Sequence, residues 1–447
     1  MNVIRCPMKI TFARFHPWLA FTWFCVTLIS RAADTVLPRE FAGATPLQWS
    51  VRMADSEMAR LGDSLEWKEG GKAKWDYTAG LFALSLLKLH EQVDDPRYVK
   101  FPMDAIGSFI ASDGKIQGYK LEDYSLDNIN AGRTALELSQ LTHDARYQKA
   151  VALLRKQLDT QPRTSDGGFW HKKRYPHQMW LDGLYMAGPF SAEYAKLFNE
   201  PATAFDDVAR QILLVAAHTY DPATGLFYHG WDESKKQSWA NKTTGTSSNF
   251  WGRAIGWYAM ALVDVLDFFP TNHPARAEII ATFQKLCAGV VKYQDAKTGL
   301  WWQVMDQGER KGNYLEASAS AMFVYALAKG VNHDYLSREY ATAAIKGYNG
   351  IIKNLIKDDR GGRWSLTQCC SVAGLGGSPS NSKMRDGSFD YYVSEPIVNN
   401  DLKGVGPFIL AGIELQSLAA PANRAQLGTA ADSHSPPERG EGWGEGI

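Results

Sequence analysis

The sequence lacks the short motifs that point to metal, phosphate or serine-nucleophile chemistry. Its 447 residues contain no His-Glu-x-x-His pair, no cysteine pair at zinc-binding spacing, no Gly-x-Ser-x-Gly turn and no glycine-rich phosphate loop. An excess of charge is missing too, because lysine plus arginine and aspartate plus glutamate each number 48. A balanced charge gives no electrostatic reason to expect a nucleic acid or an anionic membrane as partner. We therefore expect no metal, no cofactor and no nucleic-acid partner.

Cysteine is also scarce. The chain has five, of which Cys6 and Cys25 lie near the N-terminus, while Cys287, Cys369 and Cys370 form no even set. A disulfide framework needs paired cysteines, so none is expected. Hydrophobic residues make up 45% of the chain instead, and tryptophan occurs 15 times. Stability must therefore come from a large apolar core, and some tryptophans are candidates for ligand platforms.

Long apolar runs are missing except close to the N-terminus. A basic region over residues 5–14 precedes an uncharged, mostly apolar run over 18–30, and residues 30–32 fit a small-x-small cleavage site. The run is shorter than the about 20 residues that a bilayer span requires. It predicts a signal peptide over residues 1–32, and hence a secreted or periplasmic protein with no membrane partner after cleavage. Residues 421–447, rich in glycine, serine, proline and charge, predict a disordered tail.

Between these ends, apolar residues recur at helical spacing. Ile255, Tyr258, Leu262 and Leu266 illustrate the pattern. Twelve such segments predict twelve helices, at about residues 46–62, 79–93, 101–112, 130–142, 144–159, 182–198, 201–219, 252–268, 275–293, 315–330, 337–356 and 404–418.

A glycine-aromatic loop is repeated between the predicted helices. Residues 221–229 (DPATGLFYH) match residues 295–303 (DAKTGLWWQ), and 165–171 and 361–364 are weaker copies. A unit of two helices and one loop, used repeatedly, is typical of helical-hairpin repeats. Six hairpins would form an all-α (α/α)6 barrel over residues 40–420, with the aromatic loops gathered at one end. An open helical solenoid is the alternative.

The densest group of chemically active side chains lies in residues 169–190. Asp182 stands where a loop enters a helix, which on its own favours an N-cap over catalysis. Trp180, His171 and Lys172 are close by and supply a ring platform, a hydrogen-bond donor and a cation. A sugar acid needs all three, so this group favours the functional interpretation.

A second cluster lies in residues 247–257. Trp251, Arg253 and Trp257 precede or open a predicted helix. Arginine can hold a carboxylate in a bidentate fork. The alternative is that both rings pack in the core and Arg253 pairs with a structural acid.

A third cluster comprises residues 126–133 (LDNINAGR), in which Asp127 could be only a turn residue. A second carboxylate near Asp182 would raise one pKa and make that group a usable acid at neutral pH. His229 is a lone histidine in a loop, which by itself is more often structural than catalytic.

Residues 177–190 (HQMWLDGLYMAGPF) and 250–264 (FWGRAIGWYAMALVD) resemble the signature segments of glycoside hydrolase family 105, the unsaturated rhamnogalacturonyl hydrolases. The chain is similar to that family also at residues 313–322 (NYLEASASAM) and 401–408 (DLKGVGPF). These motifs come in the family's order and extend over roughly residues 40–420. The resemblance implies an (α/α)6 barrel and a relation to the family 88 unsaturated glucuronyl hydrolases.

The resemblance also implies an unusual hydrolysis. The substrate carries a C4–C5 double bond left by a polysaccharide lyase, and the enzyme hydrates it instead of attacking the glycosidic bond. Asp182 matches the family's catalytic position and is expected to be the general acid and base. Asp127, whose match is looser, is expected to raise the pKa of Asp182 and to orient the reacting groups. The expected substrate-binding residues are Tyr77, Lys172, Trp180, His229, Trp251, Arg253 and Trp257.

The expected reaction is release of a terminal unsaturated galacturonyl residue from rhamnogalacturonan, a pectin. Three alternatives stay open: an unsaturated glucuronyl hydrolase acting on ulvan or glycosaminoglycan fragments, a catalytically silent sugar-binding barrel, and a conventional two-carboxylate glycosidase.

Overall fold

The structure is a computed structural model that describes residues 38–62, 74–377 and 384–419. The predicted signal peptide over 1–32 and the predicted tail over 421–447 lie outside these residues. Within the described part of the chain, no helix is both long and apolar enough to cross a membrane.

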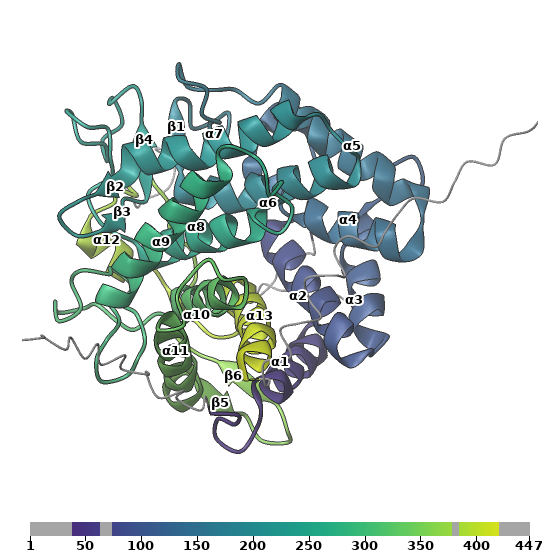
Figure 1. Ribbon diagram of the computed structural model, residues 1–447, viewed down its shortest axis with the longest axis vertical. Helices are drawn as coiled ribbons and strands as arrows, with labels where there is room; N and C mark the ends of the chain where they lie inside the picture. Colours follow the sequence, from purple (N-terminus) through teal and green to yellow (C-terminus); the bar gives the residue numbers. More distant parts are fainter. Residues whose placement is uncertain (1–37, 63–73, 378–383, 420–447) are drawn as a thin grey trace, which may run out of the picture. The chain divides into compact units, whose positions relative to one another are not determined.

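An inner ring of helices closes on itself (Figure 1). Its helices are α2 (Tyr77–Val93), α4 (Ala131–Thr142), α6 (Leu181–Leu197), α8 (Gly252–Val265), α10 (Ala317–Asn332) and α13 (Leu402–Ala419). Each contacts the next in this order, and α13 packs against α2. The return contact closes the ring, so the fold is an (α/α)6 barrel and not an open solenoid.

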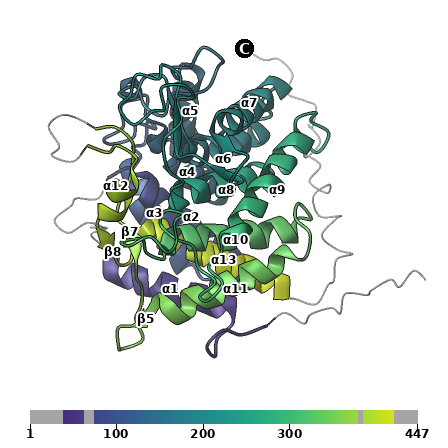
Figure 2. The same ribbon diagram turned by 90° about the vertical axis from the view of Figure 1, so that its left-hand side faces the viewer.

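Six further helices pack outside this ring. They are α1 (Pro46–Leu61), α3 (Arg97–Ala105), α5 (Ala145–Asp159), α7 (Ala202–Thr219), α9 (Arg276–Lys292) and α11 (Tyr340–Asn354). Most of them cover the inner helix that neighbours them in sequence, and α1 also packs on α13 (Figure 2). Every residue of α8 is buried, whereas α9 buries one face only. This contrast explains why the inner helices are apolar all round and the outer ones amphipathic.

The predicted helices agree with the observed ones to within a few residues, apart from two differences. The helix predicted over 101–112 is α3, which ends at Ala105 and is followed by the short 3₁₀ turn η1 (Gly107–Phe109). Gly107 lies so close to Tyr147 that a Cβ there would be 2.5 Å from the Tyr147 hydroxyl. The short helix α12 (Phe389–Ser394) was not predicted, because six residues are too few for a periodic pattern.

Short irregular segments join the outer helices to the inner ones. Two more 3₁₀ turns, η2 (Leu121–Asp123) and η3 (Leu126–Asn128), precede α4. In the part of the chain that the structure describes, the strands form four antiparallel pairs: β1 (Gln178–Trp180) with β4 (Gly230–Asp232), β2 (Tyr220–Asp221) with β3 (Leu226–Phe227), β5 (Ile356–Asp358) with β6 (Trp364–Leu366), and β7 (Cys369–Cys370) with β8 (Ile397–Val398).

The repeated loop has the same geometry in both of its best copies. The Asp221 carboxylate accepts hydrogen bonds from the backbone and hydroxyl of Thr224, and Asp295 does the same with Thr298. A glycine follows each threonine, with φ values of +82° at Gly225 and +79° at Gly299. Both loops lead from an outer helix into the next inner one, so they lie at the N-terminal ends of the inner helices.

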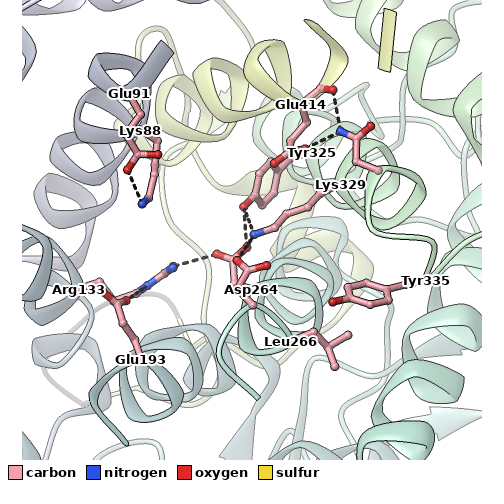
Figure 3. A network of polar contacts seen from close by, with 12 residues as sticks. Lys88, Glu91, Arg133, Glu193, Asp264, Leu266, Tyr325, Lys329, Tyr335 and Glu414 are labelled. Carbon is pink, nitrogen blue, oxygen red and sulfur yellow. Dashed lines mark hydrogen bonds and ion pairs between the residues drawn. The ribbon is translucent and has the colours of Figure 1, made fainter. Parts of the chain in front are cut away.

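The opposite end of the ring holds a network of charged side chains (Figure 3). Its centre is Asp264, the next-to-last residue of α8, which accepts hydrogen bonds from Arg133 at 2.9 Å and from Lys329 at 2.8 Å. Tyr325 donates a third, at 2.6 Å, and Glu193 lies 3.4 Å from Arg133. All these side chains are buried or nearly so.

Candidate active site

A cavity of about 870 Å³ opens where the inner helices begin. Its size is within the range of about 300–1,000 Å³ that is usual for small-ligand sites. The walls come from the start of α2, from η3, from the segment between α5 and α6, and from the segment that leads into α13. Asp127 and Asp182 both line it, as do Tyr77, Lys172 and Trp180. The structure thus brings together five of the nine predicted site residues around one space.

Asp182 is the second residue of α6 and follows β1 directly. The N-cap of α6 is Trp180, and the helix has no side-chain cap, so the N-cap interpretation of Asp182 is not supported. Its side chain is 15% exposed, and its Oδ2 lies 3.0 Å from the Nε2 of His229. A carboxylate in the first turn is favoured by the helix dipole, which explains why the position tolerates a charge so close to the core.

His229 is fully buried beside Asp182. Leu181, the first residue of α6, donates its backbone N–H to the His229 carbonyl at 3.0 Å, and this bond ties the two segments together. The Nδ1 of His229 lies 2.8 Å from the hydroxyl of Tyr392, on α12. Burial raises the pKa of Tyr392, so its hydroxyl is protonated and can donate to Nδ1. In that arrangement the ring proton is on Nε2 of His229, which lies 3.0 Å from Asp182 Oδ2 but is not aligned with it for a hydrogen bond.

Asp127 differs from Asp182 in having both oxygens engaged. Its Oδ1 lies 3.3 Å from the Nε2 of His171, and its Oδ2 accepts a hydrogen bond from Lys172. Burial raises the pKa of this carboxyl, but the charge and hydrogen bond of Lys172 outweigh burial and hold the pKa below its ordinary value. Asp127 is therefore an ionised, ion-paired carboxylate at neutral pH.

His171 lies in the same wall as Asp127. It is buried and stacks on Trp180, with ring centroids 4.6 Å apart. Desolvation lowers the pKa of His171 to about 4, against the opposing effect of Asp127. The imidazole is thus neutral at neutral pH, and Lys172 supplies the positive charge in this wall.

The predicted aromatic residues fall into two groups. Tyr77 lines the cavity, and Trp180 does so although it is only 5% exposed. Trp251 and Trp257 are each 1% exposed: Trp251 donates to Gln303 at 3.1 Å, and Trp257 stacks on Tyr185. Both rings lie in packing positions behind the wall, so their contact with substrate stays a prediction.

Arg253 lies beneath the cavity floor and is 1% exposed. Its guanidinium donates to the Cys370 carbonyl at 2.5 Å and to the Ser318 hydroxyl at 3.3 Å. Its charge nevertheless acts on Asp401 and Tyr77, which both line the cavity. The predicted bond from Arg253 to a uronate stays a prediction, because the guanidinium has protein partners here.

The backbone of this cluster approaches its neighbours closely at two glycines. A Cβ at Gly252 would lie 3.0 Å from the Trp302 carbonyl, and one at Gly256 would lie 2.8 Å from the sulfur of Met322. These glycines let α8 pack tightly against the next loop and helix.

Several cavity residues were missed by sequence reasoning. Lys403 and Asp401 form an ion pair at the start of α13, and Arg385 comes from the preceding segment. Arg174 and Tyr175 follow Lys172 in the wall. Asp401 and Lys403 stand in the segment 401–408 noted above, but nothing in its spacing distinguishes a site residue from a helix cap.

Comparisons with known proteins identify this barrel as a glycoside hydrolase and give its family. Residues 49–419 match the family described as Glycosyl Hydrolase Family 88. A family 105 glycoside hydrolase from C. acetobutylicum ATCC 824 is 44% identical in sequence and superposes with a TM-score of 0.78, over 82% of this chain and 99% of that one. The chain therefore belongs to Glycosyl Hydrolase Family 88 and, with the clostridial enzyme, to the family 105 glycoside hydrolases.

Two more distant proteins extend this comparison. The unsaturated rhamnogalacturonyl hydrolase YesR of Bacillus subtilis is 28% identical over 259 residues, which are 57% of this chain and 70% of YesR. The unsaturated glucuronyl hydrolase of Bacillus sp. GL1 is 12% identical with a TM-score of 0.62, over 83% of this chain and 96% of that one. At this identity the second likeness concerns the fold alone.

Proposed function

We propose that this enzyme removes a terminal unsaturated galacturonyl residue from rhamnogalacturonan oligosaccharides by hydrating its C4–C5 double bond. The observation that carries the proposal is the unequal state of the two cavity carboxylates. Asp182 faces the cavity with His229 as its neighbour, whereas Asp127 is ion-paired with Lys172 and has the neutral imidazole of His171 3.3 Å from its other oxygen. One free acid/base group suffices for hydration of a double bond. A conventional glycosidase needs two working carboxylates, and Asp127 would have to leave its partners to serve as one.

The proposed reaction uses Asp182 twice. Its protonated carboxyl gives a proton to C4, and the positive charge that develops at C5 is shared with the ring oxygen. The resulting carboxylate then takes a proton from a water molecule as that water bonds to C5, which returns Asp182 to its starting state. The C5 hemiketal opens, and its collapse releases the sugar to which the uronate was joined.

The charge around the cavity supports an anionic substrate. Arg385 lines it, and so do Lys172 and Lys403, which are paired with Asp127 and Asp401. The N-termini of the inner helices, which carry partial positive charge, also begin at this end. YesR, which is 28% identical over 259 residues, is named as an unsaturated rhamnogalacturonyl hydrolase, and this supports galacturonate as the terminal sugar. We further propose that the enzyme acts outside the cytoplasm, on the basis of the predicted signal peptide over residues 1–32.

The test is turnover of lyase-generated oligosaccharides by the purified protein. We expect the absorbance of the conjugated double bond to disappear with the unsaturated rhamnogalacturonan disaccharide, and the saturated disaccharide to stay intact. Equal cleavage of the saturated sugar would refute hydration. Faster turnover of ulvan or glycosaminoglycan fragments would reassign the substrate, and no turnover of any of them would leave a sugar-binding barrel.

A further inference from the structure

We propose that a second hollow beside the active-site cavity binds the sugars beyond the released linkage, and that Arg174 recognises the carboxylate of the next uronate there. This inference rests on the proposed function and extends it from the terminal sugar to the length and charge of the oligosaccharide. The hollow has a volume of about 590 Å³, and we call it the outer hollow. Its lining residues are Glu122, Asp123, Ser125, Asn128, Lys172, Lys173 and Arg174.

The outer hollow adjoins the active-site cavity. Lys172 and Arg174 line both spaces, so these two residues form the border between them. On the inner side of this border, Lys172 is bound to Asp127. A chain of sugars whose first residue sits at Asp182 can therefore pass Arg174 and continue into the outer hollow.

Arg174 differs from the two lysines before it. Lys172 is paired with Asp127, and the Lys173 ammonium lies over the Tyr124 ring, 5.6 Å from its centroid. Arg174 is exposed, and among the described residues no carboxylate lies within ion-pair distance of it. Its guanidinium packs on Tyr175 at 4.9 Å, and Tyr175 stacks on Trp180 at 4.8 Å. This stack holds the guanidinium at the border and leaves its N–H donors free.

The chemistry of the hollow fits an alternating acidic oligosaccharide. Rhamnogalacturonan alternates rhamnose with galacturonate, so a carboxylate recurs at every second sugar. A planar guanidinium can bind such a carboxylate through two parallel hydrogen bonds. The exposed carboxylates of Glu122 and Asp123 can accept hydrogen bonds from sugar hydroxyls. They also repel the carboxylate of a uronate, unless Arg174 binds that carboxylate. The charge of Arg174 therefore decides whether a second uronate is favoured.

The experiment compares kcat/KM for the unsaturated disaccharide and the unsaturated tetrasaccharide, which carries a second galacturonate. For the wild-type enzyme we expect the tetrasaccharide to be preferred by about five- to tenfold, as one charge-assisted contact in a partly exposed site provides. In Arg174→Gln the ratio should fall to about one. When the second carboxyl of the tetrasaccharide is reduced to an alcohol, the wild-type enzyme should no longer prefer the tetrasaccharide over the disaccharide. In Arg174→Gln the same reduction should not lower the ratio of kcat/KM any further. Arg338→Gln removes another exposed arginine that lines neither space, and its ratio should equal that of the wild type.

Two outcomes would overturn the proposal: a wild-type ratio of one, or an equal loss on both substrates in Arg174→Gln, which would place Arg174 at the terminal sugar. Turnover of the disaccharide reports on the proposed function separately. If neither substrate were turned over, calorimetry with the saturated tetrasaccharide and disaccharide would still test the outer hollow. Tighter binding of the tetrasaccharide that depends on Arg174 would support it, and equal binding would refute it.

Discussion

The two ends of the barrel each hold a cluster of charged residues, and only one of them has the properties of an active site. At the far end, Asp264 is 2% exposed and accepts hydrogen bonds from Arg133, Lys329 and Tyr325. At the cavity end, Asp182 is 15% exposed and has His229 beside it. The far cluster neutralises its own charge, whereas the cavity cluster keeps one carboxylate accessible to a ligand.

Shifted pKa values do not separate the two clusters. Burial raises the pKa of Asp264, but Lys329 and Arg133 outweigh it and lower that pKa to about 2. In the same network burial raises the pKa of Glu193 to about 8 despite Arg133. These shifts are as large as those of catalytic groups, yet the residues are sealed in the barrel. Access to the cavity, and not the size of a pKa shift, distinguishes Asp182 from Asp264.

The largest effect expected is that of Asp182→Asn. The variant should fold, because α6 has no side-chain cap to lose, and it should still bind the unsaturated sugar. Its kcat should fall by about 10²- to 10⁴-fold, since a general acid contributes this much. Steady-state kinetics and circular dichroism check both points, and a folded variant that keeps more than about a tenth of wild-type kcat would exclude the assignment.

The matching change at the far end is Asp264→Asn, which should act on stability and not on chemistry. Arg133 and Lys329 would lose their shared counter-charge in the core, at a cost of about 3–5 kcal/mol in unfolding free energy. The control is Asp159→Asn, whose carboxylate is 58% exposed and paired with Arg155, and its cost should stay below about 1 kcal/mol. Equal midpoints of urea unfolding for the two variants would contradict the comparison.

The acid sensitivity of the cavity end should follow His171. Its pKa is about 4 in the folded protein, below the ordinary 6.5, so the unfolded chain binds a proton more readily. The contribution of neutral His171 to the free energy of unfolding is therefore complete above pH 6.5. It is lost as the pH falls from 6.5 toward 4, by on the order of 1–3 kcal/mol. His171→Gln should flatten the dependence of unfolding free energy on pH in this window. An unchanged slope would show that His171 is not the group responsible.

Tyr392→Phe tests how His229 is positioned. Without the hydroxyl, Nδ1 of His229 loses its 2.8 Å partner, and the imidazole is no longer held in one tautomer toward Asp182. We expect kcat to fall by about tenfold with little change in KM, and the pH profile of kcat to shift. A purely structural role would lower the unfolding temperature and leave the pH profile in place.

The smallest effect expected is that of Arg253→Lys. If the guanidinium reaches the uronate, KM should rise by about three- to tenfold, because a point charge replaces a fork. The variant should keep its fold, as judged by circular dichroism. Unchanged kinetics together with lower stability would assign Arg253 to its bonds with Cys370 and Ser318 alone.

The sequence predicted the helices because periodicity is a local property. Twelve periodic segments predicted the six helical hairpins. The repeated aspartate-glycine loops predicted that the loops gather at one end of the barrel. Periodicity alone left closure of the ring open, since closure depends on a contact between α13 and α2, and the closed barrel was predicted through the family resemblance.

The site was only partly predictable for the same physical reason. Asp182 and Lys172 stand in one short segment, so their proximity could be inferred. The position of His229 depends on the pairing of β1 with β4, in which Trp180 lies opposite Gly230. Tyr392 is 163 positions from His229 and lies on a helix too short to give a pattern. No local signal connects these residues.

Ring closure also has a consequence for the order in which this chain can acquire its structure. Ser50 on α1 donates a hydrogen bond to the Ile409 carbonyl on α13, 359 positions away, at 2.8 Å. Gly412 packs against α1 so closely that a Cβ would lie 2.2 Å from the Ser50 hydroxyl. As the chain leaves the ribosome, the apolar flanks of α1 and α2 must therefore wait for more than 300 residues before α13 covers them. Contacts of such high sequence separation slow folding and leave partly made chains prone to aggregation, so the nascent protein has its greatest need of a chaperone just before its last helix is made.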